Sequence, residues 1–299
     1  MGKITEEYEA VKFGLPLFGV SPRFYADIAK SAEDNGFESV WMPEHLVFPE
    51  SIPPTYLYSE SGYPPVSSDT PLFDVWVSLA YIAHATSSIR LATNVYVLPL
   101  RHPIEVARSV VTLDRLSNGR VTMGIGVGWL AEEFEAVGRG FHDRGRRADD
   151  MIVLMRRLWH DDVIEVHDDH FDFGPVKFQP KPRFGSIPIE VGGVSPPALR
   201  RAGRLGDGWI EIGSADLDEV RQKLDVVLKH RHEAGRDGEP FEVTLGGQFG
   251  RDVDGVRQCQ DLGATRIVVA PRVPSGERIT PELIADFCKR FADEVITKV

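Results

Sequence analysis

The sequence predicts an α/β protein built as a (β/α)8 TIM barrel with insertions. Eight short runs of apolar and β-branched residues alternate with segments of helical periodicity, and this alternation is typical of a parallel sheet covered by helices. Eight strands are also the number that closes such a sheet into a barrel. The chain of 299 residues contains no internal repeat, low-complexity tract or linker, so we expect a single domain over residues 1–299.

The expected elements follow one another with few interruptions. The apolar runs predict strands at residues 11–17, 38–42, 89–98, 120–127, 187–191, 209–212, 241–245 and 266–270. Apolar positions at helical spacing predict helices at residues 23–35, 71–86, 103–116, 130–137, 144–159, 196–206, 217–234, 253–262 and 281–295. Proline at a helix start, as at Pro103, and glycine just past a helix end, as at Gly36, support these boundaries.

Two stretches break the alternation of strands and helices. Residues 46–70 are rich in Pro, Ser and Tyr and have no period, which is typical of a lid or binding loop. Residues 162–185 predict an inserted β-hairpin, and we interpret His167–His170 in its turn as solvated in preference to a metal site. The basic run Arg144–Arg147 is likewise interpreted as a solvated helix start. We expect no bound metal.

Charge and composition exclude several classes of partner. The net charge of −11 argues against a general nucleic-acid surface or an anionic membrane surface. The N-terminal residues are acidic and lack an apolar segment, so no signal peptide is expected, and no apolar run reaches the roughly 18 residues of a membrane span. Cys259 and Cys288 have no metal-ligand spacing, which fits a reducing cytosol. We therefore expect a cytoplasmic protein whose partner is a small molecule.

Two glycine turns stand at the ends of consecutive predicted strands. Gly192-Gly193-Val194-Ser195 precedes a helix whose free N-terminal amides can stabilise a phosphate. Gly126-Val127-Gly128-Trp129 lets a ligand approach the backbone closely, and Trp129 offers a stacking face. Taken singly, each is about equally well explained as an ordinary strand–helix turn. Because consecutive barrel strands are adjacent, the pair predicts one phosphate-bearing cofactor at the C-terminal mouth of the barrel.

Two further strand ends carry candidate residues. At Glu44-His45, the histidine can act as a general acid or base near neutral pH, and Glu44 can orient it or pair with a nearby basic group. The alternative is a structural histidine at the start of a loop. Asn94-Val95 lies in the third predicted strand, where the residue types alone indicate an ordinary buried strand end.

Four segments together resemble the luciferase-like monooxygenase superfamily, and most closely its branch of deazaflavin (coenzyme F420)-dependent oxidoreductases. They are VWMPEH (residues 40–45), LATNVYVLPLRHP (91–103), LDRLSNGRVTMGIGVGWLAEEFEAVG (113–138) and IPIEVGGVSPPALRRAGRLGDGW (187–209). The resemblance covers about residues 13–291, and the last two segments are specific in order and spacing.

The resemblance implies a luciferase-like TIM barrel, usually dimeric, with its cofactor at the C-terminal mouth. It implies that Asn94-Val95 forms a non-proline cis peptide behind the ring, and that His45 lies beside the reactive carbon. Glu44 stands where the deazaflavin branch often has Asp. The residues implied to line the ring and the start of its tail are Gly126, Val127, Gly128 and Trp129, and those implied to bind the phosphate are Gly192, Gly193, Val194 and Ser195.

The implied reaction is hydride transfer between F420 and a small organic substrate, with His45 supplying a proton. The sugar-phosphate dehydrogenases of this branch carry Glu where Trp129 stands, which argues against a sugar-phosphate substrate. The tyrosines of the predicted lid favour an apolar or aromatic one. Alternatives are an FMN-dependent monooxygenase or reductase fed by a partner protein, a barrel lyase or isomerase acting on a phosphorylated substrate, and a catalytically silent flavin-binding protein.

Overall fold

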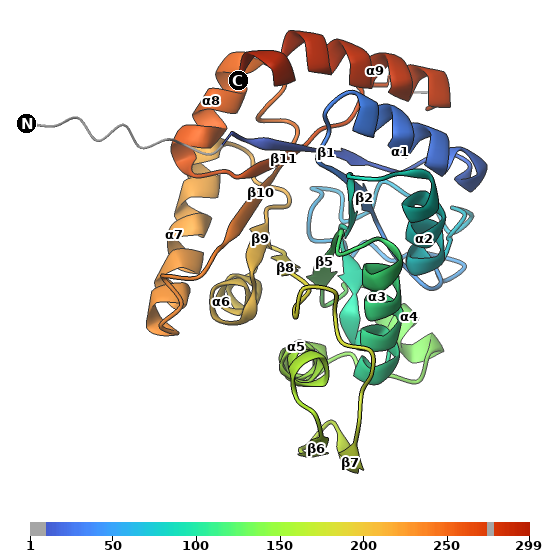
Figure 1. Ribbon diagram of the computed structural model, residues 1–299, viewed down its shortest axis with the longest axis vertical. Coiled ribbons are helices and arrows are strands. Elements are labelled where there is room, and N and C mark those ends of the chain that lie inside the picture. The colour runs from blue at the N-terminus through green and yellow to red at the C-terminus, as the bar shows by residue number, and fades with distance from the viewer. Residues whose placement is uncertain (1–9, 274–277) are drawn as a thin grey trace, which may run out of the picture.

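Eight parallel strands close into a barrel in the computed structural model, which describes residues 10–273 and 278–299 (Figure 1). The barrel strands are β1 (Lys12–Pro16), β2 (Ser39–Met42), β3 (Arg90–Thr93), β5 (Val121–Gly126), β8 (Ile189–Gly192), β9 (Gly208–Ile210), β10 (Glu242–Gly246) and β11 (Arg266–Val268). Each pairs in parallel with the next along the chain, and β11 pairs with β1 to close the circle. The predicted fold class is therefore confirmed.

Helices surround the barrel and bury their apolar faces against it. They are α1 (Tyr25–Asp34), α2 (Val75–Ala85), α3 (Pro103–Leu116), α5 (Arg144–His160), α6 (Pro196–Leu205), α7 (Leu217–Glu233), α8 (Val253–Leu262) and α9 (Pro281–Glu294), with a short α4 (Ala131–Ala136) between β5 and α5. Three 3-10 turns, η1 (Pro22–Phe24), η2 (Leu98–Leu100) and η3 (Ile296–Lys298), complete the helical elements of the described residues. Among those residues, none of the helices combines the length and apolar composition that crossing a bilayer requires.

The barrel interior is filled, so the open C-terminal mouth is where a ligand can bind. Trp41, Ala92, Ile210 and Val268 form a small internal core. Towards the N-terminal end of the strands, Arg266 makes a fully buried ion pair with Glu190, with Nη1 and Oε1 2.7 Å apart.

Most predicted boundaries lie within two residues of the structure, and two differ by more. The third strand is predicted as one run at 89–98, but β3 ends at Thr93 and a separate strand, β4 (Tyr96–Val97), pairs with β5. Apolar residues on both sides of Asn94 hide this break. The second helix is predicted from residue 71 but begins at Val75, because the Asp74 carboxylate caps it by accepting a hydrogen bond from the Val77 amide.

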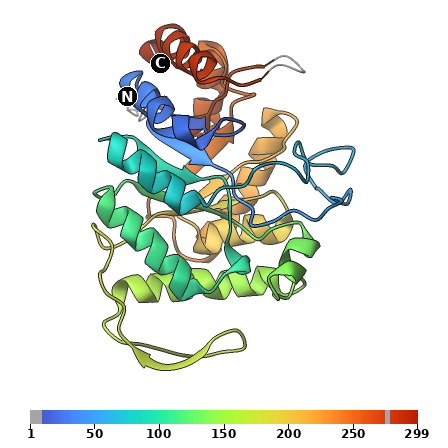
Figure 2. The ribbon, with the colours of Figure 1, turned by 90° about the vertical axis from the view of Figure 1, so that its right-hand side faces the viewer.

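The two interruptions have different structures. Residues 43–74 contain no helix or strand, and Figure 2 shows this segment gathered at one end of the barrel. The second is an antiparallel hairpin of β6 (Ile164–His167) and β7 (Asp172–Val176), which projects beyond α5 in both views (Figures 1 and 2).

Glu33, near the end of α1, holds the segment that leads into β3. Its Oε1 accepts hydrogen bonds from the amides of Ser87 at 2.8 Å, Ser88 at 2.5 Å and Ile89 at 3.0 Å. Burial opposes ionisation, but these bonds prevail and lower the pKa of the Glu33 carboxyl from 4.5 to about 2. Because the folded-state pKa lies below the unfolded one, the resulting stability is present above the unfolded pKa and is lost as the pH falls toward the folded one.

We expect Glu33→Gln to lower the free energy of unfolding at pH 7 by about 1–2 kcal/mol, since a neutral acceptor replaces a charged one. The deficit should shrink as the pH falls below the ordinary glutamate pKa of about 4.5. Chemical denaturation at pH 7 and at successively lower pH measures it, with the exposed Glu294→Gln as control. A deficit that stays constant with pH would show that the carboxylate charge is not the cause.

Candidate functional site

The two glycine turns lie side by side at the mouth, with Val95 between them. β5 and β8 are paired, with Ile125 opposite Val191. A Cβ built on Gly126 would lie 2.6 Å from Val95 Cγ2, and one built on Gly192 would lie 2.6 Å from Val95 Cγ1. Both positions therefore require glycine while Val95 occupies this place.

Val95 reaches this position at the break between β3 and β4. The Asn94–Val95 peptide bond is cis, and the Asn94 amide donates to the carbonyl oxygen of Met42 at 2.8 Å. Beside it, the hydroxyl of Thr93 donates to the carbonyl oxygen of Gly124 at 2.7 Å. These bonds tie the ends of three neighbouring strands together directly beneath Val95.

The turn after β8 leaves hydrogen-bond donors free at the start of α6. Gly193 adopts φ +120°, a conformation that favours glycine, and the indole N–H of Trp209 donates to its carbonyl oxygen at 2.9 Å. Within the described residues, the amides of Val194 and Ser195 donate to no protein group, and the Ser195 side chain caps no amide. Pro196 and Pro197 follow and carry no N–H. The donor set of this turn fits a phosphate.

His45 is held by a carboxylate that comes from another element. Its Nδ1 lies 2.8 Å from Oε2 of Glu133 in α4, and the Leu46 amide donates to Oε1 of the same carboxylate at 2.6 Å. The Glu133 side chain is fully buried. Because a carboxylate only accepts, Nδ1 carries the hydrogen, which leaves Nε2 as the nitrogen that can accept or release a proton.

Glu44 does not orient His45, although the two residues are adjacent. Its Oε1 accepts from Arg101 Nη2 at 2.5 Å, and its Oε2 accepts from the Val97 amide at 2.9 Å. Burial raises the pKa of the Glu44 carboxyl, and Arg101 beside it opposes the rise. Of the two roles considered for Glu44, the structure therefore supports pairing with a basic group, Arg101. The carboxylate also holds β4 in place through the Val97 amide.

Aromatic side chains from residues 43–74 close over the mouth. Tyr56 contacts Trp129 edge-to-face with ring centroids 5.2 Å apart, and Trp129 in turn meets the His45 ring at 5.9 Å. Tyr58 continues the cluster: its hydroxyl lies 3.4 Å from the position that a Cβ on Gly193 would take. Tyr63 lies outside this cluster and is 54% exposed.

The sequence model of luciferase-like monooxygenases matches residues 9–250. The chain belongs to the luciferase-like monooxygenase family. The predicted family and the enzyme class, an oxidoreductase, are thereby confirmed.

Relatives of this luciferase-like protein extend over most of its length. It is 34% identical over 279 residues to an uncharacterized protein of Mycobacterium tuberculosis (strain ATCC 25618 / H37Rv), which covers 92% of this chain and 96% of that one. It is 27% identical over 300 residues to the F420-dependent glucose-6-phosphate dehydrogenase of Amycolatopsis mediterranei (strain U-32), covering 99% and 82%. A solved F420-dependent secondary alcohol dehydrogenase, in complex with an F420-acetone adduct, shares the fold with a TM-score of 0.76 at 16% identity, covering 96% and 99%.

The site of this luciferase-like enzyme contains polar groups that sequence reasoning missed. Glu133 is one, because an acid in the first turn of a helix is normally explained by the helix dipole. Glu211, just past β9, is another: its side chain is buried, Oε1 accepts from the Ser214 amide at 2.6 Å, and Oε2 has no partner among the described residues. A lone Glu within an apolar run, as in residues 209–212, is the one signal that sequence offered.

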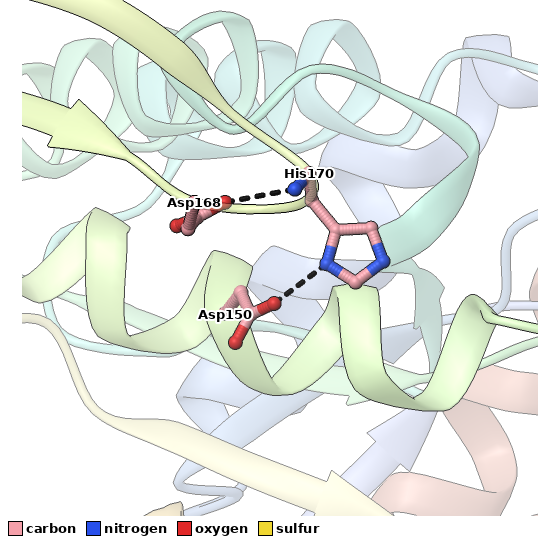
Figure 3. A group of neighbouring side chains, drawn as sticks. All are labelled: Asp150, Asp168 and His170. Atoms are coloured by element: carbon pink, nitrogen blue, oxygen red, sulfur yellow. Dashed lines mark hydrogen bonds and ion pairs between the residues drawn. The ribbon is translucent and has the colours of Figure 1, made fainter.

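The hairpin turn of the luciferase-like chain is less solvated than predicted. Figure 3 shows Asp150 of α5 beside Asp168 and His170 of the turn. His170 Nδ1 lies 2.6 Å from Asp150 Oδ2, and Asp168 Oδ1 accepts from the His170 amide at 2.8 Å. The interpretation as a solvated turn is wrong for His170, whose side chain is 13% exposed, and right for His167, at 58%. Hydrogen bonds within the protein account for this cluster, which connects the hairpin turn to α5.

Proposed function

We propose that this protein is an F420-dependent oxidoreductase that transfers a hydride between the deazaflavin and a small organic substrate. The observation that carries the proposal is the position of Val95 against both Gly126 and Gly192. One flat ring with a phosphate tail, laid on Val95, would reach both glycine turns. The F420-dependent relatives support this choice of cofactor.

The residues present fit such a cofactor. The amides of Val194 and Ser195 would hold the phosphate, and Tyr58, whose hydroxyl lies beside Gly193, would cover it. Gly126 to Trp129 would border the ring, and Glu44 with Arg101 would support its edge from β2 and β4. When bound, a deazaflavin supplies or accepts a hydride at one ring carbon.

His45 would handle the proton that accompanies the hydride. Glu133 fixes the ring so that Nε2 is available, and stabilises the imidazolium when it forms. Phe48 and Trp129 flank the imidazole at centroid distances of 4.9 and 5.9 Å and limit the access of water. We propose a substrate other than a sugar phosphate, because Trp129 stands where the sugar-phosphate dehydrogenases of the branch carry Glu.

A titration of the purified protein with F420 and with FMN, side by side, tests the cofactor. We expect quenching of tryptophan fluorescence and a dissociation constant at least tenfold lower for F420. Tighter binding of FMN would favour the monooxygenase or reductase alternative. If neither cofactor binds, the proposal is overturned. The alternative of a lyase or isomerase then remains, in which Gly192–Ser195 binds the phosphate of the substrate.

We also propose that the protein is a cytoplasmic homodimer. Cys259 and Cys288 are both free thiols, which fits a reducing compartment. The outward face of α2 supports the dimer: Val77 is 70% and Tyr81 51% exposed, although the helix carries no Asp, Glu, Lys or Arg. A helix that is apolar on all sides is normally buried, and a second copy would cover this face.

Val77→Glu should convert the dimer to a monomer, because a charge would be buried at the interface without a partner. Light scattering after size-exclusion chromatography measures the mass. Leu228→Glu on α7, also an exposed apolar residue at 44%, is the matched control and should leave the mass unchanged. A wild-type monomer, or equal effects of the two variants, would refute the α2 interface.

A further inference from the structure

A cavity of about 260 Å3 lies on the side of Trp129 next to α4 and the start of α5. It is lined by Thr55, Leu57, Trp129, Ala131, Glu132, Phe141 and Arg144. Leu57, from the segment that closes over the mouth, is 74% exposed, so the cavity has an open edge toward solvent. The cavity therefore lies between that segment and the barrel, with Trp129 as its wall toward His45.

Arg144 brings an uncompensated positive charge to this cavity. Its Nε donates to the Gly128 carbonyl at 3.0 Å, its Nη1 donates to the Phe141 carbonyl at 2.9 Å, and its guanidinium lies 3.7 Å above the Phe141 ring. No carboxylate lies within 4.0 Å of it in the described part of the chain. Burial, with Arg201 nearby, lowers the pKa of Arg144. The interpretation of Arg144–Arg147 as a solvated helix start is therefore wrong for Arg144, which is half-buried, and for Arg147, which is buried.

Glu132 brings a second unpaired group. Its Oε2 is buried and accepts no hydrogen bond within residues 10–273 and 278–299. It forms no ion pair with Arg144 within the same limits, although both line the cavity. A buried acceptor of this kind is stabilised by a donor that a ligand would supply.

The remaining residues that line the cavity favour a ligand with an aromatic ring. Trp129 and Phe141 present rings, Leu57 and Ala131 are aliphatic, and Thr55 adds one hydroxyl. An apolar cavity of roughly 150 Å3 accommodates benzene, so the larger cavity here has room for one ring with polar substituents.

We propose that this cavity is a binding subsite for an aromatic carboxylate that also carries a hydroxyl or amino group. The carboxylate pairs with Arg144, and the hydroxyl or amino group donates to Glu132. The assignment as a substrate subsite rests on the proposed function: Trp129 lines this cavity and also contacts the His45 ring, so the cavity adjoins the proposed site of reaction. A carboxylate in the tail of the cofactor is the other source of the same chemistry.

Binding of 4-hydroxybenzoate, measured by calorimetry on the full chain without cofactor, tests the proposal directly. We expect it to bind at least tenfold more tightly than 4-hydroxybenzamide, which lacks the charge, and more tightly than benzoate, which lacks the donor. Arg144→Gln should remove the preference for 4-hydroxybenzoate over 4-hydroxybenzamide. Glu132→Gln should weaken the preference for 4-hydroxybenzoate over benzoate. The exposed Arg146→Gln and Glu135→Gln are the matched controls and should bind like the wild type.

Equal binding of 4-hydroxybenzoate and 4-hydroxybenzamide to the wild type would overturn the proposal, as would unchanged binding by both Arg144→Gln and Glu132→Gln. The wild-type comparison does not depend on whether Arg144→Gln folds. Repeating the titration with saturating F420 separates the two sources: retained binding assigns the cavity to the substrate, and competition overturns that assignment in favour of the cofactor tail. Because the first titration contains no cofactor, its outcome is independent of whether F420 binds.

Discussion

Replacing His45 with glutamine should lower turnover by about 10²–10⁴-fold, which is the usual contribution of a positioned general acid or base. Glutamine can still donate to the Glu133 carboxylate, so the local structure survives, but an amide cannot take up and release a proton near neutral pH. The dissociation constant of F420 should change less than about threefold. Turnover is followed as the change in deazaflavin absorbance, with a substrate that the wild-type protein converts.

Comparing turnover with the affinity for F420 distinguishes a role of His45 in proton transfer from a structural role in the cofactor site. His160→Gln, at the exposed C-terminal end of α5, is the control and should match the wild type in both measurements. Full turnover by His45→Gln would remove His45 from the proton transfer. Loss of F420 binding in parallel with turnover would instead make His45 a structural part of the cofactor site.

Glu133→Gln is expected to lower kcat by about 10–100-fold, because Glu133 would act on the reaction through His45. Residues that orient a functional histidine have effects of about this size when they are changed. The variant removes the charge that stabilises the imidazolium of His45 and makes the ring orientation ambiguous, since an amide both donates and accepts. KM for the substrate and the dissociation constant of F420 should change little, which distinguishes positioning from binding.

Glu135→Gln, two residues further along α4 and exposed, is the matched control for Glu133. A thermal melt of both variants checks the fold, because Glu133 also accepts from the Leu46 amide. If Glu133→Gln loses stability while kcat per folded molecule stays at the wild-type value, then Glu133 supports the loop and not the reaction.

The backbone was largely predictable because most elements are specified locally. Residues 103–116 begin with proline and carry apolar residues at helical spacing, and α3 has the same limits. The break after Thr93 was not predictable in this way, because residues 89–98 are mostly apolar and the break is made by bonds to β2 and β5.

The candidate site was predictable where it depends on strand order and not where it depends on side-chain direction. Consecutive barrel strands must be adjacent, so the two glycine turns had to meet. Glu44 and Glu133 are different: the carboxylate beside His45 in sequence turns away to Arg101, and the one that binds it lies 88 residues away. Arg144 and His170 look like solvated groups because charged residues usually are, and only the packing of Phe141 and of α5 against them shows otherwise.

A crystal structure of the protein with bound F420 tests most directly whether Val95 and the two glycine turns hold one cofactor. We predict the deazaflavin ring against Val95 with His45 facing its reactive carbon, and the phosphate at the amides of Val194 and Ser195. A phosphate bound elsewhere, or a ring that contacts neither Val95 nor the turn Gly126–Trp129, would contradict the account.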